Sequence, residues 1–267
     1  EDLREAWREF LGNLAPYPMG SDPGSKALSE GVVAEDAWSA GHYADVKGGH
    51  NGEQVWMTPV FQFEDYTLET EDDELRRIAE RTYDALPRRR GFLMGLERGH
   101  WLRIPILAAR MGRANEMAPM LATSVTAAPY PNGYSLCGKP HSESMQPFGR
   151  TAAALQDALM QSLSPKPGEP EIIRIAPAWP KDWSATFRLL ARGGFLVTSS
   201  VENGEVKFVE ITSRLGEECR VRNPWAGKVE VRRESEDVRQ LEGGIIKFAT
   251  DAGAQYLLTP AGAPEPK

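Results

Sequence analysis

The sequence predicts a mainly helical protein that carries a separate β domain at its C-terminal end. Before residue 165, apolar residues recur at the 3.6-residue spacing of amphipathic helices, and long loops separate the helical segments. The segment PKPGEPE (165–171) has the composition of a linker. Beyond it, apolar and polar residues alternate with the two-residue period of strands. We therefore expect a helical region over 1–165, followed by a linker and a small antiparallel β-sandwich over 166–267.

The composition excludes several classes of protein. The chain has 267 residues, 41% of them hydrophobic and 26% charged, which is typical of a globular protein rather than a disordered one. Its net charge is −7, so a basic face for nucleic acid is not expected. No apolar run approaches the length of a membrane-spanning helix. The chain does not begin with Met, which we interpret as a processed or truncated start.

The cysteine and histidine spacings predict neither a disulfide framework nor a metal site. Cys137 and Cys219 are far apart and belong to no CxxC motif, so both are expected to be unpaired. The four histidines show no HExxH or H-x3-H spacing. Glu64-Asp65 and the acidic run from Glu69 to Glu74 lack the glycine of a calcium loop, and we interpret the run as acids at a helix N-terminus.

The helical segments show clear apolar stripes. Thr70-Glu71-Asp72-Asp73 resembles a capping box and predicts a helix N-terminus with the Thr70 hydroxyl as its cap. Helix pairs joined by long loops are typical of a toroid or solenoid of α-hairpins rather than a closed four-helix bundle. The expected helices cover 3–14, 75–86, 102–110, 117–125 and 151–163.

The β region contains one strong hairpin signal. Two alternating runs within 193–213 flank Glu202-Asn203-Gly204, a sequence typical of a tight hairpin turn. The short runs CRVRN, KVEVRR, IIKFAT and QYLLTP continue the strand pattern. We interpret Gly193 and Gly194 as a bend at which a Cβ atom would clash.

Several of these segments resemble glycoside hydrolase family 95, the α-L-fucosidase family. The resemblance covers about residues 56 to 225 and is strongest after residue 148. It rests on motifs of the stretch where the family's toroid runs into its C-terminal β domain. The matching residues are Ala158–Ser162, Ala176–Pro180, Trp183, Arg188 and Ala191–Phe195, with a weaker echo in Gly99-His100-Trp101 and Ala108–Gly112.

This resemblance implies a partial (α/α)6 toroid followed by a β-sandwich, and hydrolysis of a glycosidic bond with inversion and without a cofactor. It implies an oligosaccharide or polysaccharide partner and favours a periplasmic or extracellular location. A complete toroid needs about twelve helices, and the sequence predicts five or six. The chain is therefore expected to be the C-terminal part of a longer protein or a reduced relative, with a companion chain or a missing N-terminal segment completing the toroid.

The residues expected at the catalytic centre depart from the family pattern. The family's catalytic base, an Asp shortly before the last helix of the toroid, aligns with Met145, which cannot accept a proton. Residues two apart in an extended segment point the same way, so Glu143 is the candidate replacement base. The acid is expected either outside this chain or at a carboxylate such as Glu97. Together the base and the acid would supply the two carboxyl groups that an inverting glycosidase needs.

The candidate substrate-binding residues are aromatic and polar groups in the loops. Trp101 is expected to stack on a sugar face, with Arg98 and His100 bonding its hydroxyl groups. The remaining candidates are His141, Gln146, His50, Asn51 and Trp56.

Other interpretations of the sequence stay open. Met145 favours a non-catalytic glycan-binding or structural module that has lost its base. A third possibility is an enzyme of another toroid family, such as a lyase in which Arg98 and His100 neutralise a uronate.

Overall fold

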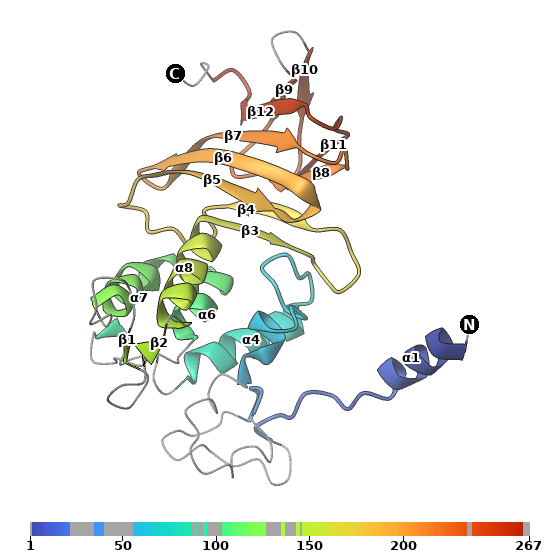
Figure 1. Cartoon of the computed structure of the whole chain (residues 1–267), viewed down its shortest axis with the longest axis vertical. Coiled ribbons are helices and arrows are strands. Elements are labelled where there is room, and N and C mark those ends of the chain that lie inside the picture. The colour runs from blue at the N-terminus through green and yellow to red at the C-terminus, as the bar shows by residue number, and fades with distance from the viewer. Residues whose placement is uncertain are drawn as a thin grey trace.

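The computed structural model describes residues 2–21, 35–39, 56–86, 89, 93–94, 103–126, 135–136, 143–144, 146–233 and 237–263. Within these residues, six helices lie on one side of two larger β-sheets (Figure 1). The mainly helical region and the C-terminal β region were both predicted. Among the described helices, none is both long and apolar enough to cross a membrane.

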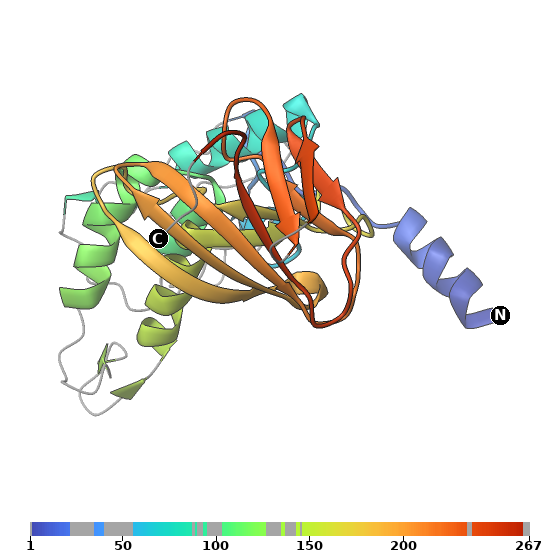
Figure 2. The ribbon, with the colours of Figure 1, turned by 90° about the horizontal axis from the view of Figure 1, so that it is seen from above.

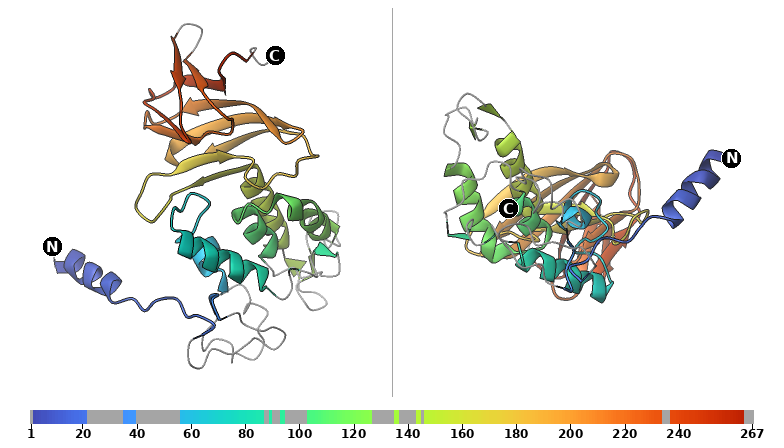
Figure 3. Two further views of the ribbon diagram at one scale, coloured as in Figure 1. Left: turned by 180° about the vertical axis from the view of Figure 1, so that it is seen from behind. Right: turned by 90° about the horizontal axis from the view of Figure 1, so that it is seen from below.

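The first helix stands apart from the others. Helix α1 (Asp2–Gly12) extends away from the rest of the molecule in every view (Figures 2 and 3). Its predicted apolar stripe faces solvent, because Leu3 is 76% exposed and Trp7 is 62% exposed. The chain reaches the body at Tyr17, whose hydroxyl donates to Asp65, and Met19 forms an isolated antiparallel bridge with Trp38.

Helix α4 (Asp73–Asp84) is capped by a different residue from the one predicted. Its N-cap is Asp72, whose carboxylate accepts hydrogen bonds from the backbone N–H groups of Glu74 and Leu75. The prediction that Thr70 caps the helix is therefore wrong. The Thr70 hydroxyl instead donates to the carbonyl of Pro165, 3.0 Å away, since the linker lies beside it in the folded chain.

Four further helices pack together beneath the sheets. Helix α6 (Ile104–Arg110) contacts α7 (Ala114–Thr126), α8 (Gln146–Leu159) and the short helix α3 (Thr58–Phe61). Every α6 residue from Ile104 to Ala109 is buried, which places this helix at the centre of the group. The described helices do not by themselves establish a ring of α-hairpins, and the toroid stays a prediction.

Helix α8 ends four residues before its predicted end. We expected the helix to continue to Leu163, but Met160–Leu163 form strand β3, which pairs with β4 (Ile172–Ile175). The N–H groups of Ala176 and Ala178 donate to the carbonyls of Leu159 and Ala158, which ends the helix. Leucine and methionine can occupy a helix or a strand, so the backbone hydrogen bonds with β4 determine that Met160–Leu163 form a strand.

The β region consists of two main sheets. The larger has the order β10-β9-β12-β7-β6-β5, and the smaller has the order β11-β8-β4-β3. A separate two-stranded pair joins β1 (Ser135–Leu136) to β2 (Glu143–Ser144). The other strands are β5 (Ala185–Ala191), β6 (Phe195–Glu202), β7 (Glu205–Ser213), β8 (Cys219–Arg222), β9 (Val229–Arg233), β10 (Asp237–Leu241), β11 (Ile245–Phe248) and β12 (Gln255–Pro260).

The predicted hairpin is confirmed as β6 and β7. Asn203 and Gly204 both have positive φ, 53° and 76°, as the central residues of a type I′ turn require. All strand pairs are antiparallel except β4 with β8, which is parallel and was not predicted. The two sheets contribute buried side chains such as Val221 and Ile211 to one hydrophobic core.

Candidate functional site

Most of the predicted site residues lie outside the described residues. These are His50, Asn51, Glu97, Arg98, His100, Trp101 and His141, together with Met145 at the expected base position. For Glu143 and Gln146 the structure describes the backbone. Glu143 lies in β2, opposite Leu136 of β1, and Gln146 is the first residue of α8. Both therefore lie at the N-terminal end of α8.

Trp56 is the one predicted site residue whose side chain is described. It is 1% exposed and belongs to the hydrophobic core beside α3. Its indole N–H has no hydrogen-bond partner in the described part of the chain. Such burial excludes direct contact between this ring and a ligand in solution in the state that the structure describes.

Helix α8 links the loop that precedes it to the β region. With 14 residues, the helix is about 21 Å long, so its two ends are well separated. At its C-terminal end, the amide of Gln161 donates to the buried carbonyl of Ala109 in α6, at 2.8 Å. The hydroxyl of Ser162 accepts a hydrogen bond from the backbone N–H of Arg192. These contacts fix the position of the helix against both α6 and the turn at Arg192.

A network of four charged side chains spans the junction between the helices and the β region. Arg192 donates two hydrogen bonds to the carboxylate of Glu64, at 2.6 and 2.8 Å. Arg110 of α6 bonds both Glu64, at 2.8 Å, and Asp157 of α8, at 2.6 Å. Glu64 adopts a positive φ of 59°, an uncommon conformation for this residue type. The surrounding ion pairs hold it there.

The two carboxylates of this network have opposite pKa shifts. For Glu64, burial raises the pKa, but the hydrogen bonds from Arg192 and Arg110 outweigh it, so the pKa lies below its usual value. For Asp157, burial is the largest effect and raises the pKa, although Arg110 opposes it. Two arginines and two carboxylates balance in charge, so the network serves to join α3, α6, α8 and the β region.

A second ion cluster is centred on Glu69. The side chain of Glu69 is only 2% exposed and pairs with Arg174 of β4 and Arg222 of β8. The Arg174–Glu69 distance is 2.6 Å, and Arg222 binds the other carboxylate oxygen. Thr67, two residues earlier, donates to the carbonyl of Ser164 at 2.8 Å. The segment 64–70 therefore docks the helical part onto the smaller sheet.

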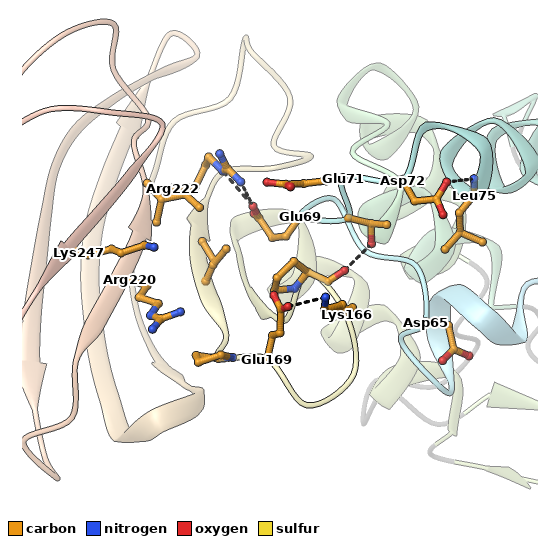
Figure 4. Close-up of a pocket in the computed structure, with 15 residues that line it drawn as sticks. Asp65, Glu69, Glu71, Asp72, Leu75, Lys166, Glu169, Arg220, Arg222 and Lys247 are labelled. Carbon is orange, nitrogen blue, oxygen red and sulfur yellow. Dashed lines mark hydrogen bonds and ion pairs between the residues drawn. The ribbon is translucent and has the colours of Figure 1, made fainter. Parts of the chain in front are cut away.

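A cleft opens beside Glu69, between α4 and the smaller sheet (Figure 4). Its volume is about 460 Å³, which is within the range of small-molecule sites. We call it the junction cleft. Its charged lining residues are Asp65, Glu69, Glu71, Asp72, Lys166, Glu169, Arg220, Arg222 and Lys247, and the others are Thr70, Leu75, Pro165, Pro170, Ile172 and Ile245. Trp56, the predicted site residue whose side chain is described, does not line this cleft.

Two opposing walls of the cleft carry side chains of opposite sign. Arg220 of β8 and Lys247 of β11 are directly opposite each other in the antiparallel register. Both extend from the sheet toward the cleft, whereas Glu71 extends toward the sheet from the segment before α4 (Figure 4). Lys166 pairs with Glu169 in the linker, 2.9 Å apart. The lining therefore offers both hydrogen-bond donors and acceptors.

The β region matches the model of a known protein family. Residues 168–258 match the family model described as glycoside hydrolase family 95, C-terminal domain. The match confirms the resemblance to the C-terminal part of glycoside hydrolase family 95. It extends from the linker into β12, and the candidate catalytic residues lie before it. No curated protein matches the chain.

The structure explains the family 95 motifs at the junction in physical terms. The Ala176–Pro180 motif supplies the amides that end α8, and Arg192 pairs with Glu64. Gly193 has a φ of +76°, and a Cβ atom there would lie 2.9 Å from the ring of buried Phe195. The prediction that this glycine pair marks a sterically restricted bend is confirmed. These motifs hold the junction together.

The roles of Glu64 and Glu69 were not predicted. We interpreted Glu69 as an acid at a helix N-terminus and considered Glu64 only for a calcium site, but α4 begins at Asp73 and only Asp72 caps it. Their arginine partners are 46 to 153 residues away in sequence, so no local pattern could indicate the pairing. Among the described residues, no group of three or more His, Cys, Asp or Glu side chains could hold a metal ion.

Proposed function

We propose that the chain is the C-terminal part of an inverting glycosidase similar to the α-L-fucosidases of family 95. The described helices then belong to an (α/α)6 toroid, and the sugar binds in its central cavity. The observation that carries this proposal is the match of residues 168–258 to the family's C-terminal domain. The contacts of Gln161 and Ser162 support it, because they join that domain to the helix that follows the candidate site.

In this mechanism, Glu143 removes a proton from the attacking water and Glu97 protonates the leaving oxygen. The short pairing of β2 with β1 gives Glu143 an extended backbone directly before α8, as the proposed replacement of the base at Met145 requires. Trp101 stacks on the sugar, while Arg98, His100, His141, Gln146, His50 and Asn51 bond its hydroxyl groups. Buried Trp56 supports the site from the core.

A non-catalytic glycan-binding module is the second candidate function. The observation that favours it is Met145, because methionine stands where the family has its base. Such a module would keep the fold and the sugar contacts of the loops without turning over a substrate.

Hydrolysis and binding assays on two variants separate these candidates. An aryl α-L-fucoside reports turnover, the anomer first released reports inversion by NMR, and calorimetry with L-fucose reports binding. If Glu143 is the base, Glu143→Gln lowers turnover by about 10²- to 10⁴-fold and leaves binding unchanged. Met145→Asp, which restores a carboxylate at the family position, is expected to raise turnover.

The control is Glu202→Gln, an exposed carboxylate in the β6–β7 hairpin. Fucose binding without turnover in the wild type and in Met145→Asp would support the binding module. Turnover that survives Glu143→Gln would show that Glu143 is not the base.

The proposal also includes a companion segment or chain that completes the toroid. The exposed apolar stripe of α1 supports it, since solvent-exposed apolar patches usually mark interaction sites. Native mass spectrometry of material purified from its source should show a second polypeptide or a longer chain. A monomer with the mass of these 267 residues would contradict this part of the proposal.

A further inference from the structure

The junction cleft has the properties of a ligand site that the predicted function does not use. The pairing of Glu69 with Arg174 and Arg222 fixes the part of its lining around Glu69. Arg220 and Lys247 come from paired strands, and Glu71 comes from the segment directly before the capped end of α4. Rigid elements therefore position the polar groups on both walls.

Some polar groups on the two walls have no hydrogen-bond or ion-pair partner among the described residues. In the described part of the chain, the side chains of Glu71 and Lys247 have neither a hydrogen-bond nor an ion-pair partner. Arg220 bonds Glu218 through Nε, at 2.8 Å, which leaves its terminal N–H groups toward the cleft. Arg220 and Lys247 are also like charges directly opposite each other on neighbouring strands, an arrangement that is unfavourable without an acceptor between them.

The chemistry of the lining selects the class of ligand. Among the described residues, five carboxylates and four basic groups line the cleft, so neither a strongly anionic nor a strongly cationic ligand suits both walls. A sugar hydroxyl donates one hydrogen bond and accepts others, as other hydroxyl groups do, so it can bond a carboxylate and a cation together. Leu75, Ile172 and Ile245 add apolar surface, which matches the C–H faces of a pyranose ring.

We propose that the junction cleft is a second glycan site, which binds a neutral oligosaccharide between Glu71 on one wall and Arg220 and Lys247 on the other. The choice of a sugar rests on the proposed function, whereas the position and the mixed charge of the site come from the cleft itself. The site lies between α4 and the smaller sheet, whereas Glu143 and Gln146 lie at the N-terminal end of α8.

Calorimetric titration of the full chain with two trisaccharides tests the proposal. The probes are 2′-fucosyllactose, which is neutral, and trigalacturonate, which carries three carboxylates. We expect the neutral probe to bind, and Lys247→Ala and Glu71→Gln each to weaken it by about three- to tenfold, as for the loss of one or two hydrogen bonds. Lys207→Ala, an exposed strand lysine outside the cleft, is the control and should not change the affinity. Because Glu71 and Lys247 are exposed, neither change should prevent folding.

The outcomes separate this site from the proposed catalytic site. Weaker binding in the Lys247 and Glu71 variants supports the second site, whether or not the chain hydrolyses a fucoside. Binding that is unchanged in both variants but lost in Trp101→Ala would overturn it and leave the catalytic proposal standing. Binding of trigalacturonate alone, or of neither probe, would also overturn it.

Discussion

Replacing Glu69 by glutamine tests whether the ion cluster holds the helical part against the smaller sheet. Glutamine keeps the size of the side chain but removes its charge, so Arg174 and Arg222 lose their shared partner. Removal of one member of a buried ion pair typically costs about 3–5 kcal/mol. Glu69 is 2% exposed, but the two arginines are 26% and 28% exposed, so water partly solvates the charges that remain. We therefore expect the free energy of unfolding to fall by about 2–4 kcal/mol.

Urea denaturation at pH 7, followed by circular dichroism, measures this loss. The matched control is Glu71→Gln, two residues further on, because Glu71 is exposed and has no ion-pair partner among the described residues. In the absence of ligand, its effect should stay within about 0.5 kcal/mol. Equal stabilities of the two variants would refute the assignment of Glu69 as the link between the two regions.

A double-mutant cycle with Arg222→Gln makes the same test more specific. If the two side chains interact as the structure shows, the effects of the two single changes should not add, and the coupling should exceed about 0.5 kcal/mol. The loss in Glu69→Gln should also persist in 0.5 M NaCl, because a buried pair is screened less than a surface pair. Additive effects would show that the two groups act independently.

Three further predictions concern other parts of the fold. Burial raises the pKa of Glu116, but the hydrogen bonds from Arg89 and Tyr83 outweigh it, so the pKa lies below the ordinary value of 4.5. The ionised Glu116 therefore stabilises the fold above pH 4.5, and this contribution disappears as the pH falls through the lowered pKa. The stability difference between wild type and Glu116→Gln, measured in urea from pH 7 to pH 3, should therefore shrink on acidification; a constant difference would contradict this. Gly193→Ala should cost more than Gly253→Ala, because both glycines have positive φ but only the first would meet a neighbouring ring, and equal unfolding midpoints would exclude that clash. Burial raises the pKa of Cys219 to about 12, so peptide mapping after treatment with a thiol reagent at pH 8 should find it unlabelled until urea unfolds the chain.

The sequence predicted the local elements of the β region well. The β6–β7 hairpin follows from alternating residues on either side of Asn203-Gly204, and the restricted bend follows from two adjacent glycines. Both signals are local, since turn geometry and strand period depend on residues a few positions apart. The family resemblance was likewise recognisable, because its motifs are contiguous and the match at 168–258 covers the strongest of them.

The sequence predicted less of the candidate site. The candidate residues were selected from loops by their chemical type. Among them, Trp56 is the residue whose side chain the structure describes, and it lies in the core. The junction cleft was not predicted, because its walls come from the segment around Glu71, the linker at 165–170 and the paired strands β8 and β11. Segments that are distant in sequence create a cleft only when they fold against each other.

The sequence by itself determined the order of the regions, the hairpin turn and the conformational demand of Gly193, because each depends on neighbouring residues. The predicted linker connects β3 with β4 of the smaller sheet. The tertiary structure decided where α8 ends, since the backbone of Met160–Leu163 found partners in β4. It also decided which acids form ion pairs that join the helices to the β region. Glu64 and Glu69 are indistinguishable from surface acids until folding places arginines from remote strands and helices within hydrogen-bond distance of them.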